Sequence, residues 1–243
     1  MGGLVDLVSM KKTLFIVLLF GFWSCKKEVL NYEINLSDEN LFNTPLIVLM
    51  HGYGGNAYNF KKGIGENGEF DSQFSIIYLE APFKIIPLMN KKIWYDFEIS
   101  NGDTISNQEQ INISTDKILK TIKRIIKEND IKSKNLYLGG HSQGGIMAYK
   151  IALGNPALFE GFIASSARLP VKYSIKDELT EYQNIKALII HGKNDNVLDV
   201  KFARAGKNLL DKLGIQTQYL VKDNGHSLVP DFAMLIQNWI EDI

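Results

Sequence analysis

Short apolar runs recur along the chain, separated by segments in which hydrophobic positions repeat every three or four residues. An apolar run of strand length without polar alternation is typical of a strand that is covered on both faces of its sheet. We predict strands at residues 29–36, 46–50, 75–79, 136–138, 161–164, 187–190 and 217–221. The first of them alternates only loosely, which favours a position near the edge of the sheet.

Four segments between or after these runs have helical periodicity. In the clearest, 111–129, isoleucines recur at helical spacing and lysines occupy the positions between them. The others are 146–153, 200–213, which Gly214 ends, and 230–240, which begins with a proline in its first turn. Strands that alternate with helices predict an α/β fold, with a mostly parallel sheet and helices on both of its faces.

Two long stretches, 83–110 and 165–184, keep no hydrophobic period. A long irregular segment in a compact domain is more often a functional loop than filler, and we expect this of the first stretch. Ligands of parallel sheets bind beyond the carboxyl ends of the strands. We expect the second stretch to lie over that end.

The stretch 136–153 reads as strand, sharp turn and helix, and it contains Gly140-His141-Ser142-Gln143-Gly144. This is the G-x-S-x-G spacing of a nucleophile elbow. A serine at the tip of so tight a turn has a strained backbone, and its neighbours two positions away must lack a Cβ. The turn would expose the Ser142 hydroxyl above the sheet and point the free N–H groups of the next helix at the reacting oxygen. A glycine-rich turn with an incidental serine is the alternative.

A serine hydroxyl needs a base within hydrogen-bond distance before it becomes a good nucleophile. Of the four histidines, His141 is adjacent to Ser142, and neighbouring side chains on a tight turn diverge. His51 and His191 each precede a glycine at a strand end, where a ring can brace a loop. His226 lies in the loop between the last strand and the last helix. We predict that His226 is the base, with a loop-bracing role as the alternative.

The base in turn needs a carboxylate that holds its tautomer. Asp195 follows the last strand but one, and the chain order Ser142, Asp195, His226 is that of α/β-hydrolase triads. Asp199 competes for this role, but its place at the start of a helix favours capping. Asp223 is too near His226 in sequence to orient the ring easily. We therefore predict Asp195.

The negative charge that develops during attack needs two fixed N–H donors. We expect one at the backbone of Gln143, directly after the serine, and the other at Tyr53 in the glycine-rich loop 51–56. Glycines in such a loop let N–H groups converge on an anion. Trp94 and Tyr95 are candidate walls of the substrate site, and a buried role in packing the long loop is the alternative.

The composition limits the kinds of function that the chain can have. Lys plus Arg and Asp plus Glu both number 27, and no local run makes a basic face for nucleic acid. The one cysteine, Cys25, allows no internal disulfide and no cysteine-based metal site. We expect neither a metal ion nor another cofactor. A chain of 243 residues suits a single domain, which we place at 29–243.

Residues 1–28 have the features of an export signal. Two lysines precede a short apolar run at 13–22, and a serine and Cys25 follow it. The segment resembles a bacterial lipoprotein signal. This implies that Cys25 carries lipid chains and that a soluble domain is held at a membrane of the bacterial cell envelope. An ordinary cleaved signal and an uncleaved anchor are the alternatives, and Met10 is a plausible start of the chain.

Five blocks of the chain occur in the order seen in the phospholipase/carboxylesterase family of α/β-hydrolases, which includes bacterial carboxylesterases, lysophospholipases and acyl-protein thioesterases. The blocks are 51–54, 94–96, 140–145, 191–195 and 225–226. The chain resembles this family from about Leu46 to its end. The resemblance implies an α/β-hydrolase fold, a triad of Ser142, Asp195 and His226, and oxyanion donors at Tyr53 and Gln143.

Together these features predict a serine esterase that hydrolyses a small-molecule or lipid ester through an acyl-serine intermediate. Lysophospholipids and thioesters are among the candidate substrates. A serine peptidase or an acyltransferase would use the same triad. A surface binding protein that kept the fold without catalysis is a further alternative.

Overall fold

Seven strands form the central sheet of the domain. The computed structural model describes residues 29–37, 44–100, 103–132, 135–172, 175–176 and 178–243. The strands are β1 (Tyr32–Asn35), β2 (Leu46–Met50), β3 (Ser75–Leu79), β8 (Leu136–His141), β9 (Gly161–Ser165), β10 (Lys186–Gly192) and β11 (Gln216–Lys222). Their order across the sheet is β1-β3-β2-β8-β9-β10-β11. All neighbours pair in parallel except β1, which pairs with β3 in the antiparallel sense. The predicted α/β fold and the edge position of the first strand are confirmed.

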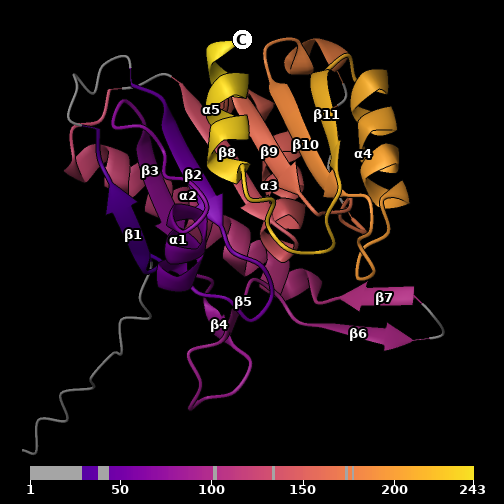
Figure 1. Cartoon of the computed structure of the whole chain (residues 1–243). Coiled ribbons are helices and arrows are strands. Elements are labelled where there is room, and N and C mark those ends of the chain that lie inside the picture. The colour runs from indigo at the N-terminus through magenta and orange to yellow at the C-terminus, as the bar shows by residue number, and fades with distance from the viewer. Residues whose placement is uncertain (1–28, 38–43, 101–102, 133–134, 173–174, 177) are drawn as a thin grey trace, which may run out of the picture.

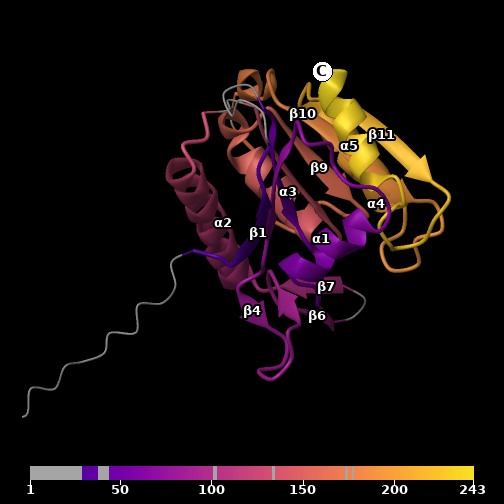
Figure 2. The same ribbon diagram turned by 60° about the vertical axis from the view of Figure 1, so that its left-hand side comes forward.

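Five α-helices of the described residues cover the two faces of this sheet (Figures 1 and 2). Helices α1 (Ala57–Gly65) and α5 (Phe232–Glu241) pack on one face. Helices α2 (Gln108–Glu128), α3 (Gln143–Gly154) and α4 (Lys201–Lys212) pack on the other. Side chains of a strand point alternately to the two faces. Accordingly Val48 and Met50 of β2 join the core under α3, whereas Ile47 and Leu49 join the core under α1 and α5.

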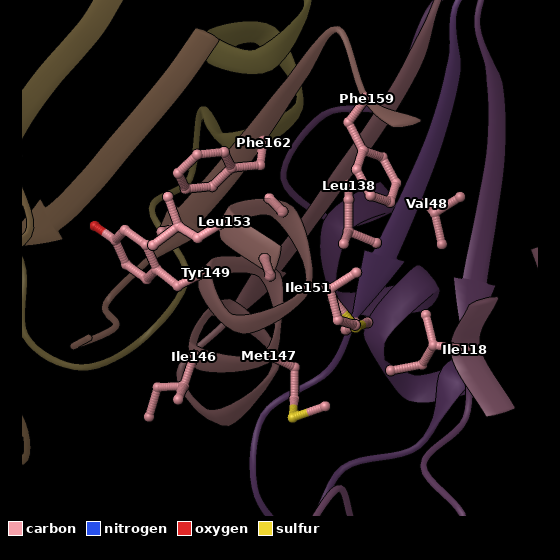
Figure 3. Close-up of a cluster of buried hydrophobic side chains, with 14 of the residues drawn as sticks. Val48, Ile118, Leu138, Ile146, Met147, Tyr149, Ile151, Leu153, Phe159 and Phe162 are labelled. Atoms are coloured by element: carbon pink, nitrogen blue, oxygen red, sulfur yellow. The ribbon is translucent and has the colours of Figure 1, made fainter. Parts of the chain in front are cut away.

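Helix α3 is the most deeply buried helix of the domain. Ten of its 12 residues are buried, among them all of the first seven. Figure 3 shows its side chains between the sheet and the neighbouring helices, with Tyr149 beside Phe162 and Ile151 between Leu138 and Ile118. The Tyr149 and Phe162 rings meet edge to face, with their centroids 5.3 Å apart. Because packing fixes this helix on several sides, its first turn holds a constant position relative to the strand before it.

The stretch 83–110 is more regular than the sequence predicts. It contains one hairpin of β4 (Phe83–Lys84) and β5 (Lys92–Ile93) and a second of β6 (Phe97–Ser100) and β7 (Asp103–Ser106). Helix α2 then begins at Gln108. Both hairpins lie beyond the carboxyl ends of the parallel strands, at the lower edge of the sheet in Figure 1.

Only the first part of the stretch 165–184 lies over the carboxyl end of the sheet. Its second part contains the 3₁₀ turn η2 (Leu179–Tyr182), next to another turn, η1 (Pro156–Leu158). The Tyr182 hydroxyl donates a 3.0 Å hydrogen bond to the Leu153 carbonyl at the far end of α3. The chain returns here to the amino end of the sheet because β10 must start beside the first residue of β9.

Two helix predictions also need correction. Helix α1 has no counterpart in the predicted set, and α5 begins after Asp231, so Pro230 precedes the helix and does not occupy its first turn. Of the helices in the described part of the chain, none combines the length and the apolar character needed to cross a membrane.

Candidate active site

The turn between β8 and α3 holds Ser142 above the carboxyl edge of the sheet. Ser142 has φ 53° and ψ −117°, a conformation that residues with a side chain rarely adopt. A Cβ on Gly140 would collide with the backbone of Gly144, and a Cβ on Gly144 would overlap the Met50 carbonyl oxygen. The turn therefore requires both glycines, and the strand–turn–helix geometry expected of a nucleophile elbow is present.

The side chains of Ser142, His226 and Asp195 form a continuous hydrogen-bonded line. Ser142 Oγ lies 2.9 Å from His226 Nε2, and His226 Nδ1 lies 2.8 Å from Asp195 Oδ2. A carboxylate only accepts hydrogen bonds, so Nδ1 carries the proton of this pair and Nε2 accepts the serine proton. The three residues follow β8, β10 and β11, and the parallel sheet brings these strand ends to one edge.

The carboxylate of Asp195 is fixed on both of its oxygens. Oδ1 accepts the backbone N–H groups of Val197 at 2.9 Å and Leu198 at 2.8 Å, while Oδ2 faces His226. Burial alone would raise the pKa of Asp195. The hydrogen bonds from Leu198, His226 and Val197 outweigh burial and lower this pKa below its ordinary value. Asp195 is therefore an anion at neutral pH that can hold the imidazole in one orientation.

Two other histidines brace the site in the neutral form. His51 Nδ1 donates to the Gly52 carbonyl at 2.7 Å, and its Nε2 accepts the Ala81 N–H at 3.1 Å. Burial lowers the pKa of His51 from 6.5 to about 4. Burial, reinforced by repulsion from His226, also lowers the pKa of His141 to about 4. The His141 ring packs against the His226 ring with the centroids 5.3 Å apart.

His191 and the competing carboxylates also take supporting positions. His191 is fully buried, and its Nε2 lies 2.7 Å from the Leu198 carbonyl and 3.3 Å from Asp195 Oδ2. It therefore supports the loop that carries Asp195. Asp199 lies just before Val200, the N-cap of α4, and accepts the Lys201 N–H, while Asp223 accepts a hydrogen bond from the Asn194 side chain.

The two predicted oxyanion donors come from two different segments next to Ser142, the loop after β2 and the first turn of α3. Gln143 is the first residue of α3, where backbone N–H groups have no partner within the helix. Tyr53 lies in the loop after β2, and a Cβ on its neighbour Gly52 would be 3.4 Å from the Ser142 Cβ. Among the described residues, neither N–H donates to a protein acceptor. Both groups are therefore available to an oxygen bound beside Ser142.

A cavity of about 440 Å³ opens beside Ser142. Its walls come from the elbow, the loop after β2, the β6–β7 hairpin and the segments that follow β9 and β10. The lining residues are Gly52, Tyr53, Tyr95, Phe97, Ile99, Thr104, His141, Ser142, Gln143, Ile146, Arg168, Val197, Leu198 and His226. Most of these side chains are apolar or aromatic, which suits a hydrocarbon part of a ligand. Tyr53, 48% exposed, packs edge to face against Phe97 at the rim of this cavity.

Of the two aromatic residues predicted as walls, only Tyr95 lines the cavity. Trp94 has no exposed surface, and its indole N–H donates to the His51 carbonyl at 2.8 Å. The expectation that Trp94 contacts substrate is therefore corrected: its ring packs beneath the site, against His51. Burial raises the pKa of Tyr95 to about 12, although the positive charge of Arg168 opposes this rise.

The side chain of Gln143 has a role that the sequence did not reveal. Its Oε1 accepts the Trp94 N–H at 2.9 Å, and its Nε2 donates to the Tyr95 carbonyl at 2.7 Å. This buried amide ties the stretch 94–95 to the elbow. No local pattern signals the contact, because it joins residues 48 and 49 positions apart.

Two expectations concern metal ions and the lipid anchor. Within the described ranges, no three His, Cys, Asp or Glu side chains come together in a way that could hold a metal ion. Cys25 and the whole of the stretch 1–28 lie outside the described residues. Lipidation of Cys25 and export to the cell envelope therefore remain predictions from the sequence.

Known proteins show the same fold over most of the chain. The carboxylesterase of Bacillus cereus superposes with a TM-score of 0.71 at 17% identity, covering 88% of this chain and 94% of the bacterial one. Acyl-protein thioesterase 2 of Zea mays gives a TM-score of 0.70 at 19% identity, covering 87% and 98%. At these identities the likeness shows the fold alone.

Comparison of sequences gives the family. Acyl-protein thioesterase 1 of Kluyveromyces lactis is 24% identical over 178 residues, which span 69% of this chain and 76% of the yeast protein. A protein of Oryza sativa subsp. japonica named "probable carboxylesterase" is 26% identical over 133 residues, and the match spans just 57% of its length. The model of the phospholipase/carboxylesterase family matches residues 35–243. The chain therefore belongs to the phospholipase/carboxylesterase family, whose members are hydrolases with the α/β-hydrolase fold.

Proposed function

We propose that this protein is a serine esterase that hydrolyses carboxylic esters or thioesters through an acyl-Ser142 intermediate. The observation that carries the proposal is the line Ser142 Oγ, His226 Nε2, His226 Nδ1, Asp195 Oδ2, with hydrogen bonds of 2.9 and 2.8 Å. These distances lie within the range at which a base takes a proton from a nucleophile without prior movement.

Acylation begins when Ser142 Oγ attacks the carbonyl carbon of the substrate and its proton passes to His226 Nε2. The carbonyl oxygen takes the negative charge and accepts hydrogen bonds from the backbone N–H groups of Tyr53 and Gln143. The imidazolium then gives its proton to the leaving alcohol or thiol as the carbon–oxygen or carbon–sulfur bond breaks. Asp195 stabilises the imidazolium and stays ionised, in agreement with its lowered pKa.

Deacylation repeats the same steps with water as the nucleophile. His226 takes a proton from water, and the resulting hydroxide attacks the acyl-Ser142 carbonyl. The oxyanion again lies between Tyr53 and Gln143, and the proton returns to Ser142 Oγ when the carboxylic acid leaves. The apolar walls of the 440 Å³ cavity support an acyl or alcohol part with hydrocarbon character. The names of the relatives, carboxylesterase and acyl-protein thioesterase, support an ester or thioester bond.

The direct test is labelling with a fluorophosphonate, which reacts with activated serines. We expect wild-type protein to be labelled and Ser142→Ala to be inert. Removal of Ser142 or His226 should lower kcat for 4-nitrophenyl butyrate by about four orders of magnitude. Ser72→Ala, which changes an exposed serine before β3, serves as the matched control and should keep full labelling.

Substrate comparison separates the esterase proposal from its rivals. The substrates are a matched butyryl ester, thioester and amide. An esterase should hydrolyse the ester and the thioester, and the amide far more slowly than either. Efficient amide hydrolysis would indicate a peptidase, and transfer to added alcohol in preference to water would indicate an acyltransferase. Absence of both labelling and ester hydrolysis in folded wild-type protein would indicate a binding protein on a hydrolase fold.

A further inference from the structure

The cavity beside Ser142 contains one side chain that does not fit a purely apolar ligand. Arg168 follows β9 and lines the cavity together with Phe97, Ile99 and Ile146. A guanidinium is a permanent cation in proteins. No carboxylate is found among the described residues that line this cavity. Arg168 therefore introduces a permanent positive charge into an otherwise apolar wall.

The backbone before Arg168 is locked in a conformation that turns it toward the site. Ser166 has φ 43°, in the left-handed region, and its N–H donates to the Ile190 carbonyl at 2.8 Å. Ala167 is 2% exposed, and a Cβ on Gly145 in the first turn of α3 would lie 2.7 Å from the Ala167 Cβ. Strain of this kind persists only where the surrounding packing determines the backbone, and it clusters at functional sites.

The Arg168 guanidinium has N–H donors that its hydrogen bond to the backbone does not use. Arg168 Nη1 donates to the Leu169 carbonyl at 3.0 Å, and a guanidinium has five N–H donors in all. In the described part of the chain Arg168 forms no ion pair with a carboxylate. Arg168 as a whole is half-buried. Burying a guanidinium without a counter-ion is costly, and a bidentate carboxylate or phosphate would offset that cost.

A second hollow adjoins the cavity. It measures about 530 Å³, shares Thr104 and Arg168 with the first, and includes the exposed Lys172 in its lining. Its described lining also contains no carboxylate. The chain as a whole has 27 basic and 27 acidic residues, so two cations without an acid in the described lining of two hollows that share Arg168 favour an anionic ligand there.

From this arrangement we propose that Arg168, assisted by Lys172, selects substrates that carry an anionic group, a carboxylate or a phosphate, apart from the ester that is cleaved. The inference rests on the proposed esterase function and narrows its substrate class. A hydrocarbon segment of the substrate contacts Phe97 and Ile99, and the anion beyond it binds the guanidinium. Arg168 is thus a residue for specificity and takes no part in bond making or breaking.

The test measures one ratio, kcat/KM for an anionic ester divided by kcat/KM for its neutral match. On the acyl side the pair is 4-nitrophenyl hydrogen suberate and its methyl ester. On the alcohol side the pair is 4-(butyryloxy)phenylacetate and its N-methylamide. We expect wild-type protein to prefer the anionic member of at least one pair, and the pair that shows the preference locates the anion on the substrate. Arg168→Gln should lower that ratio about tenfold, and Arg168→Glu should lower it further.

Arg204→Gln is the matched control, because it removes one exposed positive charge from α4 and should leave the ratio unchanged. Equal ratios in wild type and Arg168→Gln for both pairs would overturn the proposal, as would an equal fall in Arg204→Gln. Raised salt should reduce the preference in wild type but not in Arg168→Gln. Loss of the esterase function itself is distinguishable, because Ser142 would then not be labelled and the neutral esters would not be hydrolysed.

Discussion

At the scale of single residues, the turn that carries Ser142 depends on the absence of a Cβ at two glycines. Ser142 accepts an unfavourable backbone conformation, and Gly140 and Gly144 leave the space in which strand and helix meet. The Ser142 N–H donates to the Ser165 carbonyl at 2.8 Å, so the turn is also tied to the end of the next strand. Neighbouring structure thus holds the strained residue, and the hydroxyl reaches His226 without reorganisation.

A single methyl group should therefore disable the turn. We expect Gly144→Ala to unfold the elbow locally, because the new Cβ would overlap the Met50 carbonyl oxygen. Hydrolysis of 4-nitrophenyl butyrate should fall by at least about a hundredfold, and the free energy of unfolding by roughly 3 kcal/mol or more, since buried backbone cannot easily move. Denaturant unfolding and steady-state kinetics measure the two effects.

Gly154→Ala is the control from the same helix. No atom lies within 4 Å of a Cβ at this position, and Gly154 is the last residue of α3. Gly154→Ala should leave the free energy of unfolding unchanged or raise it by up to about 1 kcal/mol. Similar losses in both variants would contradict the steric account of the elbow.

At the scale of elements, the buried strands could be predicted from sequence and the surface hairpins could not. The runs 46–50 and 75–79 match β2 and β3 residue for residue, because strands covered on both faces must be apolar throughout. Strand β6 is exposed along its whole length, so no buried run marks it. Helix α1 was missed because glycines interrupt its pattern, and its cap, where Asn56 accepts the Asn59 N–H, is a local signal that could have indicated its start.

The same distinction applies to the site. Ser142, Asp195 and His226 could be placed because each follows a recognisable strand, and parallel strands end at one edge. The side-chain role of Gln143, the burial of Trp94 and the approach of Arg168 depend on contacts between distant segments. Such contacts leave no periodic trace in a single sequence, and only the folded arrangement shows them.

The β6–β7 hairpin should determine how well apolar substrates bind while adding little to stability. Phe97 and Ile99 face the cavity from one side of the hairpin and are 41% and 71% exposed. Each lost methylene contact costs about 0.8 kcal/mol when it is fully buried. The double variant Phe97→Ala, Ile99→Ala should therefore lower kcat/KM for a 4-nitrophenyl decanoate roughly tenfold relative to the acetate. The free energy of unfolding should change by no more than about 1 kcal/mol.

Ile105→Ala provides the comparison within the same hairpin. Ile105 pairs with Glu98, so it lies on the other side of the hairpin from Phe97 and Ile99. It lines the adjoining hollow of about 530 Å³ but not the cavity beside Ser142. The decanoate-to-acetate ratio should be unchanged in this variant. An equal change in Ile105→Ala would mean that the hairpin acts through its overall position and not through its cavity face.

At the scale of the whole molecule, two histidines with lowered pKa values couple folding to pH. His51 and His141 have pKa values lowered from 6.5 to about 4, chiefly by burial. Between these two pH values the unfolded chain binds protons that the folded protein does not. The free energy of unfolding therefore rises with pH through this window. The stability that the two neutral histidines contribute is present above about pH 6.5 and is lost as the pH falls to about 4. The lowered pKa of Asp195 acts in the same direction, at a pH below its unfolded value of 3.8.

The slope of stability against pH is the quantity that tests this coupling. His51 and His141 each contribute up to about 1.4 kcal/mol per pH unit between pH 4 and 6.5. We expect His51→Gln, measured by urea unfolding across this range, to have a shallower slope than wild type, whatever its absolute stability. Lys123→Gln removes one exposed positive charge from α2 and leaves every histidine in place, so it should keep the wild-type slope.

His51 also braces the glycine-rich loop that carries Tyr53, because its Nε2 accepts the Ala81 N–H. Protonation of Nε2 would break this hydrogen bond, so the loop should become less stable together with the rest of the fold. Parallel slopes in wild type and His51→Gln would mean that the His51 ring can take up a proton within the folded protein, and that this link between the loop and global folding does not exist.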